Sequence, residues 1–152
     1  MSNDTSRINA TTDDLTQRNE QITRLLDQRY DALNQHLANA ESVLKNLRPP
    51  HPVWICYEED YYCEMLGIAK IADTWRLAYG ESHLDTEDIR GVKPLSDCPV
   101  ATRVEACRHL TELHNKIVEA KERYLPSIDA AIQEIERFCQ SHTQAGPKPG
   151  KK

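Results

Sequence analysis

The chain of 152 residues lacks most of the motifs that mark common classes of enzyme. It contains five glycines in all, and no glycine-rich loop of the kind that holds nucleotide phosphates. The H-E-x-x-H motif of zinc proteases and the G-x-S-x-G motif of serine hydrolases are also absent. No catalytic constellation is visible in the spacing of its residues, so we expect a protein that is not an enzyme.

Other absences bear on compartment and partners. No apolar run approaches the roughly 18–20 residues of a membrane span, and the polar N-terminus has no apolar core of a secretory signal. The five cysteines are odd in number and follow no framework spacing, which favours free thiols in a reducing cytoplasm. The net charge of −5 disfavours binding to nucleic acid.

Metal-binding patterns are missing as well. The acidic loops have no D-x-D-x-D-G spacing for calcium, and the cysteines form no C-x₂₋₄-C pair for zinc. Cys56 and Cys63, together with His51 or His83, are in principle able to hold zinc, but buried free thiols are the more common outcome. We therefore expect no metal and no cofactor.

A long helix is predicted from residue 12 to residue 48, because no glycine or proline interrupts this stretch and Pro49 and Pro50 end it. Its apolar residues recur at alternating steps of four and three, which is the heptad seam of a coiled coil. The seam consists of Leu26, Tyr30, Leu33, Leu37, Ala40, Leu44 and Leu47, and Leu15 and Ile22 extend it upstream.

A second long helix is predicted over residues 97–141, with a kink or short break near Leu125 because Pro126 cannot donate the helical hydrogen bond. The same alternating steps occur at Leu110, Leu113, Ile117, Ala120 and Tyr124, and then at Ile128, Ala131, Ile135 and Phe138. The two helices match in length, so we predict that they pair as antiparallel, coiled-coil-like arms. An adjoining row of Val118, Leu125, Ile132 and Cys139 widens the stripe and favours a bundle of more than two helices, and hence a homodimer.

The segment between the helices, residues 51–95, is predicted to form an antiparallel meander of three or four strands. Strands are expected over residues 53–57, 62–71 and 75–79, with a polar turn at 58–60 and a tight turn at Ala72, Asp73 and Thr74. A short fourth strand over residues 91–95 is limited to an edge by Pro94. Both faces of the second strand are partly apolar, so we expect the helices to cover one face and a second copy to cover the other.

The predicted fold class is therefore α+β: two long antiparallel helices flank a small antiparallel meander. Residues 1–11 are expected to be a disordered leader, residues 12–141 a single helix–sheet–helix domain, and residues 142–152 a disordered basic tail.

The middle segment also carries the features that point to function. Residues 51–98 hold six of the nine aromatic residues, and they carry ten acids against four bases. The leading hypothesis is a non-enzymatic interaction or regulatory protein, a homodimer that presents an acidic, tyrosine-rich meander to a protein with a basic surface. Its predicted partner-binding residues are Glu58, Glu59, Asp60, Tyr61, Tyr62, Glu81, Asp85, Glu87 and Asp88.

A second hypothesis is a sensor that binds a small anionic ligand, such as a metabolite or nucleotide, in a pocket between the sheet and the helices. Its expected lining is Trp54, Trp75, Arg76 and Arg108, since arginine binds anions well. Trp75, Leu77 and Tyr79 share one strand face, which fits either an aromatic binding platform or a sheet core.

Overall fold

The structure, a computed structural model, describes residues 2–83 and 88–144, with side chains for residues 11–83 and 88–143. It has the predicted α+β architecture, in which an antiparallel sheet follows one long helix in the chain and precedes another. The elements in chain order are α1 (Ser2–Asn46), β1 (Val53–Glu59), β2 (Tyr62–Ile71), β3 (Thr74–His83), β4 (Ile89–Pro94), the 3₁₀ turn η1 (Leu95–Asp97), α2 (Val100–Cys107) and α3 (Leu110–Gln144).

The four strands form a meander in the order β1-β2-β3-β4, and each pairs antiparallel with the next. The turn between β2 and β3 has two residues rather than the predicted three, because Ile71 pairs with Thr74. Ala72 and Asp73 in this turn both have positive φ angles, of 51° and 65°. Such turns twist in the same sense as the strands that they join, which stabilises this hairpin.

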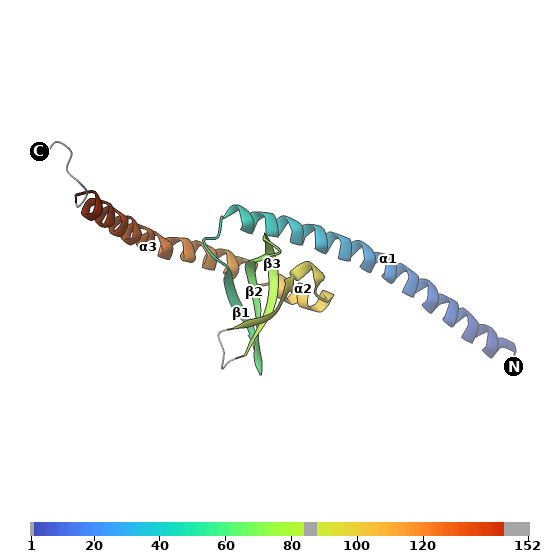
Figure 1. Cartoon of the computed structure of the whole chain (residues 1–152). Helices are drawn as coiled ribbons and strands as arrows, with labels where there is room; N and C mark the ends of the chain where they lie inside the picture. The colour runs from blue at the N-terminus through green and yellow to red at the C-terminus, as the bar shows by residue number, and fades with distance from the viewer. Residues whose placement is uncertain (1, 84–87, 145–152) are drawn as a thin grey trace, which may run out of the picture.

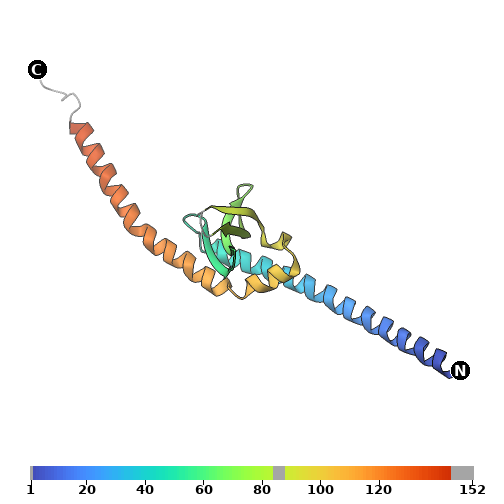
Figure 2. The ribbon, with the colours of Figure 1, turned by 90° about the horizontal axis from the view of Figure 1, so that it is seen from below.

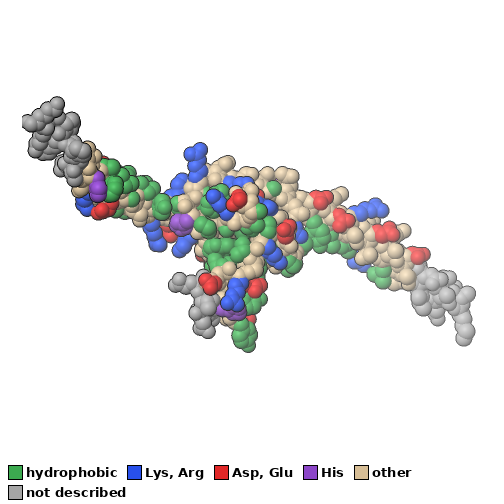
Figure 3. Space-filling model, in the orientation of Figure 1, with side chains coloured by type: hydrophobic (Ala, Val, Ile, Leu, Met, Phe, Trp, Pro, Cys, Tyr) green, Lys and Arg blue, Asp and Glu red, His purple; other side chains and the backbone are tan. Residues whose placement is uncertain are grey.

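The two long helices leave the sheet in opposite directions (Figures 1 and 2). The predicted antiparallel pairing of the two helices along their length is therefore not shown within the chain. Every side chain of residues 11–29 and of residues 121–143 is exposed. We call these two segments the α1 arm and the α3 arm. Hydrophobic side chains reach the surface on both arms (Figure 3).

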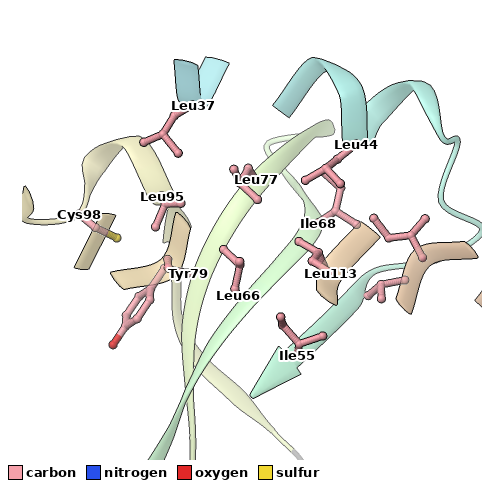
Figure 4. Packing of buried hydrophobic residues seen from close by; sticks show 13 residues of the cluster. Leu37, Leu44, Ile55, Leu66, Ile68, Leu77, Tyr79, Leu95, Cys98 and Leu113 are labelled. Carbon is pink, nitrogen blue, oxygen red and sulfur yellow. The ribbon is translucent and has the colours of Figure 1, made fainter. Parts of the chain in front are cut away.

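The helices diverge because the halves of their seams nearest the sheet pack against the strands. Leu37 and Leu44 of α1 and Leu113 and Ile117 of α3 are buried in the core. They meet one face of the sheet, where the buried side chains are Val53, Ile55, Leu66, Ile68, Leu77 and Tyr79 (Figure 4). Burial of these side chains against the strands, at about 25 cal/mol per Å² of apolar surface, stabilises this arrangement of the helices.

The opposite face of the sheet is covered in part by the sheet itself. Trp54 points to this face, and its ring lies over Gly67, where a Cβ atom would stand 2.4 Å from Trp54 Cε3. A Cβ atom on Gly80 would meet both Trp54 of β1, at 3.4 Å, and Ile89 of β4, at 2.4 Å. The first and last strands therefore curl toward each other over two glycines, which shields much of the face that we expected a second copy to cover.

The limits of the helices differ from the predicted ones. α1 begins at Ser2 rather than near residue 12, because no glycine or proline separates the expected leader from the helix. The second predicted helix is divided into η1, α2 and α3, with a turn at Arg108 and His109 that is closed by bonds to Glu105 and Ala106 carbonyls. α3 continues through Pro126 without a break, and it curves along its length (Figure 2). From residue 145, the predicted tail lies outside the described residues.

Candidate functional site

Three glutamates stand side by side across three strands, at the end of the sheet that carries the β1–β2 turn. Glu58 of β1 is the register partner of Glu64 of β2, and Glu64 is the register partner of Glu81 of β3. We call these three residues the acidic row. Like charges at directly opposed positions destabilise a sheet, so the row has a cost in stability. Arg90 of β4 follows Glu81 in the register, but no ion pair joins them among the described residues.

The hydroxyl group of Tyr79 reduces the repulsion within the acidic row. It lies 3.0 Å from Glu81 Oε1 and 3.2 Å from Glu64 Oε1, so one proton serves two carboxylates. Burial, followed by the hydrogen bond to Glu81 and the charge of Glu64, raises the pKa of the Tyr79 phenol above its ordinary value. The phenol therefore stays protonated, and the row is bridged by a neutral donor rather than by a cation.

The predicted residues of the β1–β2 turn lie next to the acidic row. The backbone N–H of Asp60 donates to the Tyr62 carbonyl at 3.1 Å and closes the turn, and the Tyr61 side chain is 87% exposed. Glu58, Asp60 and Tyr62 line a cleft of about 180 Å³ together with Glu64. Glu59 lies close to Cys63, whose thiol donates to Glu59 Oε1 at 3.9 Å. We call residues 58–62 the hairpin tip.

The described ends of the second predicted acidic segment lie at the same end of the sheet. Tyr62 pairs with His83, and Ser82 pairs with Ile89, so the end of β3 and the start of β4 lie on the side of the sheet that carries the β1–β2 turn. Glu81 and Asp88 are both exposed there. The other two predicted residues of this loop, Asp85 and Glu87, lie outside the described residues.

The two thiols near the hairpin tip do not form a metal centre with their neighbours. Cys56 and Cys63 are close enough to interact, and all five cysteines are free. Burial and then the contact with Cys63 raise the pKa of the Cys56 thiol to about 11. No group of three or more histidine, cysteine or acidic side chains is arranged to hold a metal ion in the part of the chain that the structure describes.

The residues expected to line a ligand pocket do not converge on one site. Arg76 is paired with Glu41 of α1 at 3.1 Å, and the exposed Arg108 faces Glu105 at 3.6 Å. Trp75 packs against the core, with the Lys70 ammonium group 5.5 Å from its ring centroid. Leu77 and Tyr79 are buried, so the aromatic face of β3 belongs to the sheet core.

Trp54 lines a different cleft, which has a volume of about 390 Å³ and lies between the start of β1 and α3. Its aromatic lining also includes His51 and Tyr124, whose ring centroids are 6.2 Å apart. Lys116 and Arg123 of α3 supply positive charge to the same cleft. Sequence reasoning did not select these two cations, because no local pattern shows that α3 passes beside the start of β1. It also missed Glu64, which the sequence places inside a strand.

Comparison with protein-family models, with curated proteins and with solved structures found no match for the chain. None of the helices in the described residues contains an apolar stretch long enough to cross a membrane.

Proposed function

We propose that the protein is a non-enzymatic interaction or regulatory protein whose acidic row and hairpin tip bind a basic surface on a protein partner. We further propose that it acts in the cytoplasm as a homodimer, in which long helices pack in the manner of a coiled coil. The alignment of Glu58, Glu64 and Glu81 across three strands is the observation that carries the proposal.

The argument rests on the balance of energies at this end of the sheet. The acidic row destabilises the sheet and contributes no buried apolar surface, so folding alone gives no reason for its presence. A partner that supplies lysine or arginine side chains relieves the repulsion and gains from complementary charge. Tyr61, exposed beside the row, provides a large amphipathic ring of the kind that anchors protein interfaces.

Charge reversal at the hairpin tip tests this proposal. Glu58→Lys, Glu59→Lys and Asp60→Lys are combined in one chain, and a matched control reverses Asp13, Glu20 and Asp27 on the α1 arm. Both chains undergo the same change in net charge at exposed positions. Proteins captured from a cell extract by each tagged chain are then quantified by mass spectrometry.

The proposal expects a set of basic proteins that the natural chain and the control retain and that the tip variant loses. The tip variant should be at least as thermally stable as the natural chain, because Glu58→Lys places a base opposite Glu64. Retention should weaken as the salt concentration rises, because exposed charges are screened. If all three chains capture the same proteins, the hairpin tip is not the binding surface.

A second candidate function is supported by the cleft at Trp54. Aromatic rings together with Lys116 and Arg123 suit a small ligand that has a flat ring and a negative charge, such as a nucleotide. Its volume of about 390 Å³ lies within the usual range for ligand pockets. The lining also contains Glu119, so its bases exceed its acids by one, and it includes Trp54 from the predicted set.

Tryptophan fluorescence tests this second function. Trp75→Phe leaves Trp54 as the single tryptophan, and the chain is titrated with a panel of nucleotides and anionic metabolites. Binding should shift the Trp54 emission, and Arg123→Gln should abolish the response, whereas Arg137→Gln, at a position outside the cleft, should preserve it. An emission that stays constant with every compound would exclude the sensor function.

A further inference from the structure

The two arms carry stripes of large apolar side chains that nothing in the chain covers. On the α3 arm these are Tyr124, Leu125, Ile128, Ile132, Ile135 and Phe138, which are between 42% and 61% exposed. On the α1 arm they are Leu15, Ile22, Leu25 and Leu26, which are between 43% and 55% exposed. Each residue lies three, four or seven positions from another member of its stripe, so the members of a stripe share one face of the helix.

The α3 stripe is as large as the largest apolar patches that monomers usually expose, and such patches are often functional. Large side chains carry on the order of 150–200 Å² each, so these six leave roughly 500 Å² of contiguous apolar surface. A groove of about 390 Å³ extends the stripe toward the sheet, lined by Pro50 and Val118 in addition to Tyr124, Leu125 and Ile128. Together with the shorter α1 stripe, this surface approaches the roughly 800 Å² that each partner contributes to a stable interface.

The charges beside the two stripes are opposite in sign. Glu122, Asp129 and Glu136 recur every seven residues along one border of the α3 stripe, next to Leu125 and Ile132. Arg18 and Arg29 lie in line with the leucines of the α1 stripe, three or four residues from them. None of these five side chains has an ion pair among the described residues.

These charges favour one kind of pairing over another. Two α3 arms packed together bring their acidic borders against stripes whose lysine, Lys121, lies at the sheet end and already donates to the Leu47 carbonyl at 2.7 Å. In an antiparallel pair the two acidic borders also face each other. An α3 arm packed on an α1 arm instead brings the three acids near Arg18 and Arg29. The arms of one chain point in opposite directions, so they cannot meet each other (Figures 1 and 2).

We propose that the α1 arm of one copy packs along the α3 arm of a second copy. The inference rests on the self-association in the proposed function and specifies its interface. The lengths agree, since 19 residues of the α1 arm extend about 28 Å and 23 residues of the α3 arm extend about 34 Å. The half of each heptad seam that lies on an arm thus pairs with a seam of the other copy. The half nearest the sheet packs on the strands of its own chain.

Complementation between two defective arms tests the inference with full chains. One variant combines Leu15→Glu with Ile22→Glu on the α1 arm, and the other combines Ile132→Glu with Ile135→Glu on the α3 arm. All four positions are about half-exposed and distant from the sheet core, so both variants should keep a folded core and lose only the stabilisation that comes from association. Mass is measured by light scattering over a range of concentrations, and mixed samples are captured through a tag on one variant.

The natural chain should show a mass above the 17.4 kDa of one copy, and each variant alone should remain a monomer. Mixed together, the two variants should form a one-to-one complex, because one contributes an intact α3 arm and the other an intact α1 arm. A matched control, Ala130→Glu with Gln133→Glu on the face of α3 opposite the stripe, should associate like the natural chain.

Charge exchange gives an independent readout. Arg18→Glu with Arg29→Glu should weaken self-association at least tenfold, and mixing this variant with a chain that carries Glu122→Lys, Asp129→Lys and Glu136→Lys should restore it. The inference would be overturned if the α1-arm variant still self-associates and does not capture the α3-arm variant. That result would show that like arms pair with each other. A natural chain that is monomeric at every concentration would overturn it too, and capture of basic proteins by the hairpin tip would then stand on its own.

Discussion

One carboxylate oxygen of Glu41 on α1 accepts two hydrogen bonds from β3. The backbone N–H of Leu77 donates to Glu41 Oε2 at 2.8 Å, and Arg76 Nε donates to the same oxygen at 3.1 Å. β4 pairs with β3 only from Ala78 onward, so the Leu77 N–H would otherwise lack a strand partner. Glu41 therefore takes the place of a missing strand and attaches the helix to the sheet.

Removing this acceptor should destabilise the protein more than removing the cation. Glu41→Ala leaves the half-buried Leu77 N–H unsatisfied, and we expect it to lower the free energy of unfolding by about 1–3 kcal/mol. Glu41→Gln retains an acceptor and should cost less, and Arg76→Ala should cost less still because the ion pair is partly exposed to solvent. Urea unfolding measures all three against Glu20→Ala on the α1 arm, and equal effects of the two Glu41 substitutions would contradict the assignment.

Removal of the hydroxyl group should change the free energy of unfolding differently at Tyr57 and at Tyr79. The buried Tyr57 hydroxyl finds no hydrogen-bond partner among the residues that the structure describes, and the Tyr57 ring stacks on His109 with 5.0 Å between ring centroids. The Tyr79 hydroxyl instead bridges two carboxylates. Tyr57→Phe should leave the free energy of unfolding unchanged or raise it, since an unsatisfied polar group is removed. Tyr79→Phe should lower it by about 1.5–3 kcal/mol, because the donor between two charged groups is lost. Chemical denaturation of both variants at neutral pH distinguishes the two environments, and equal losses would contradict them.

Gly67 should not tolerate a side chain. A Cβ atom there would meet Trp54 Cδ2 at 2.5 Å and the Val53 carbonyl at 2.7 Å, so Gly67→Ala should cost about 1–3 kcal/mol through overpacking. In a Trp54→Ala background the cost should fall, but not vanish, because the Val53 carbonyl remains.

Gly91→Ala provides the control. Gly91 has a φ of 63° and open space around it, so the substitution should cost about 1 kcal/mol from backbone conformation alone. The three values come from thermal or urea unfolding, and a Gly67→Ala variant as stable as the natural chain would show that Trp54 does not lie over it.

Local sequence patterns contain the elements of this fold and the meander order of its strands, but not the way in which the helices pack. β2 spans the predicted residues because turns flank it on both sides. A heptad seam shows that a helix face needs cover, without showing what covers it: Leu37 and Leu44 pack on strands, whereas Leu26 is exposed. The break at Arg108 and His109 involves no helix-breaking residue, so its origin is tertiary and the sequence gives no sign of it.

The acidic row depends on register, which local patterns determine weakly. A three-residue turn after Ile71 would have set Trp75 opposite that residue. The two-residue turn sets Thr74 there instead, and so brings Leu77 opposite Ile68 and Glu81 opposite Glu64. The clustering of charge at residues 58–62 was visible in the sequence, but the contribution of Glu64 appears only when the strands are paired.

The Cys56 thiol should ionise only at high pH. Its pKa of about 11 means that roughly one thiol in a thousand is ionised at pH 8, so alkylation by iodoacetamide should be slow there and should rise until about pH 11. Cys139→Ser removes the other exposed thiol and leaves Cys56 as the principal target. Added to that background, Cys63→Ala should move the rise to lower pH, because it removes the thiol contact while the partial desolvation of the Cys56 thiol by its surroundings remains. In the Cys139→Ser chain, an alkylation rate that reaches half its maximum near pH 9 would contradict the raised pKa of Cys56.

The same titration affects stability with a defined sign. The folded chain keeps the Cys56 proton at pH values where the unfolded chain has lost it. The folded state therefore binds more protons than the unfolded state between about pH 9 and pH 11. The contribution of this thiol to the free energy of unfolding is therefore present below pH 9 and declines as the pH rises through 11. Cys56→Ala should flatten this part of the stability profile relative to the natural chain. A profile with an unchanged slope would show that the thiol is not desolvated by the fold.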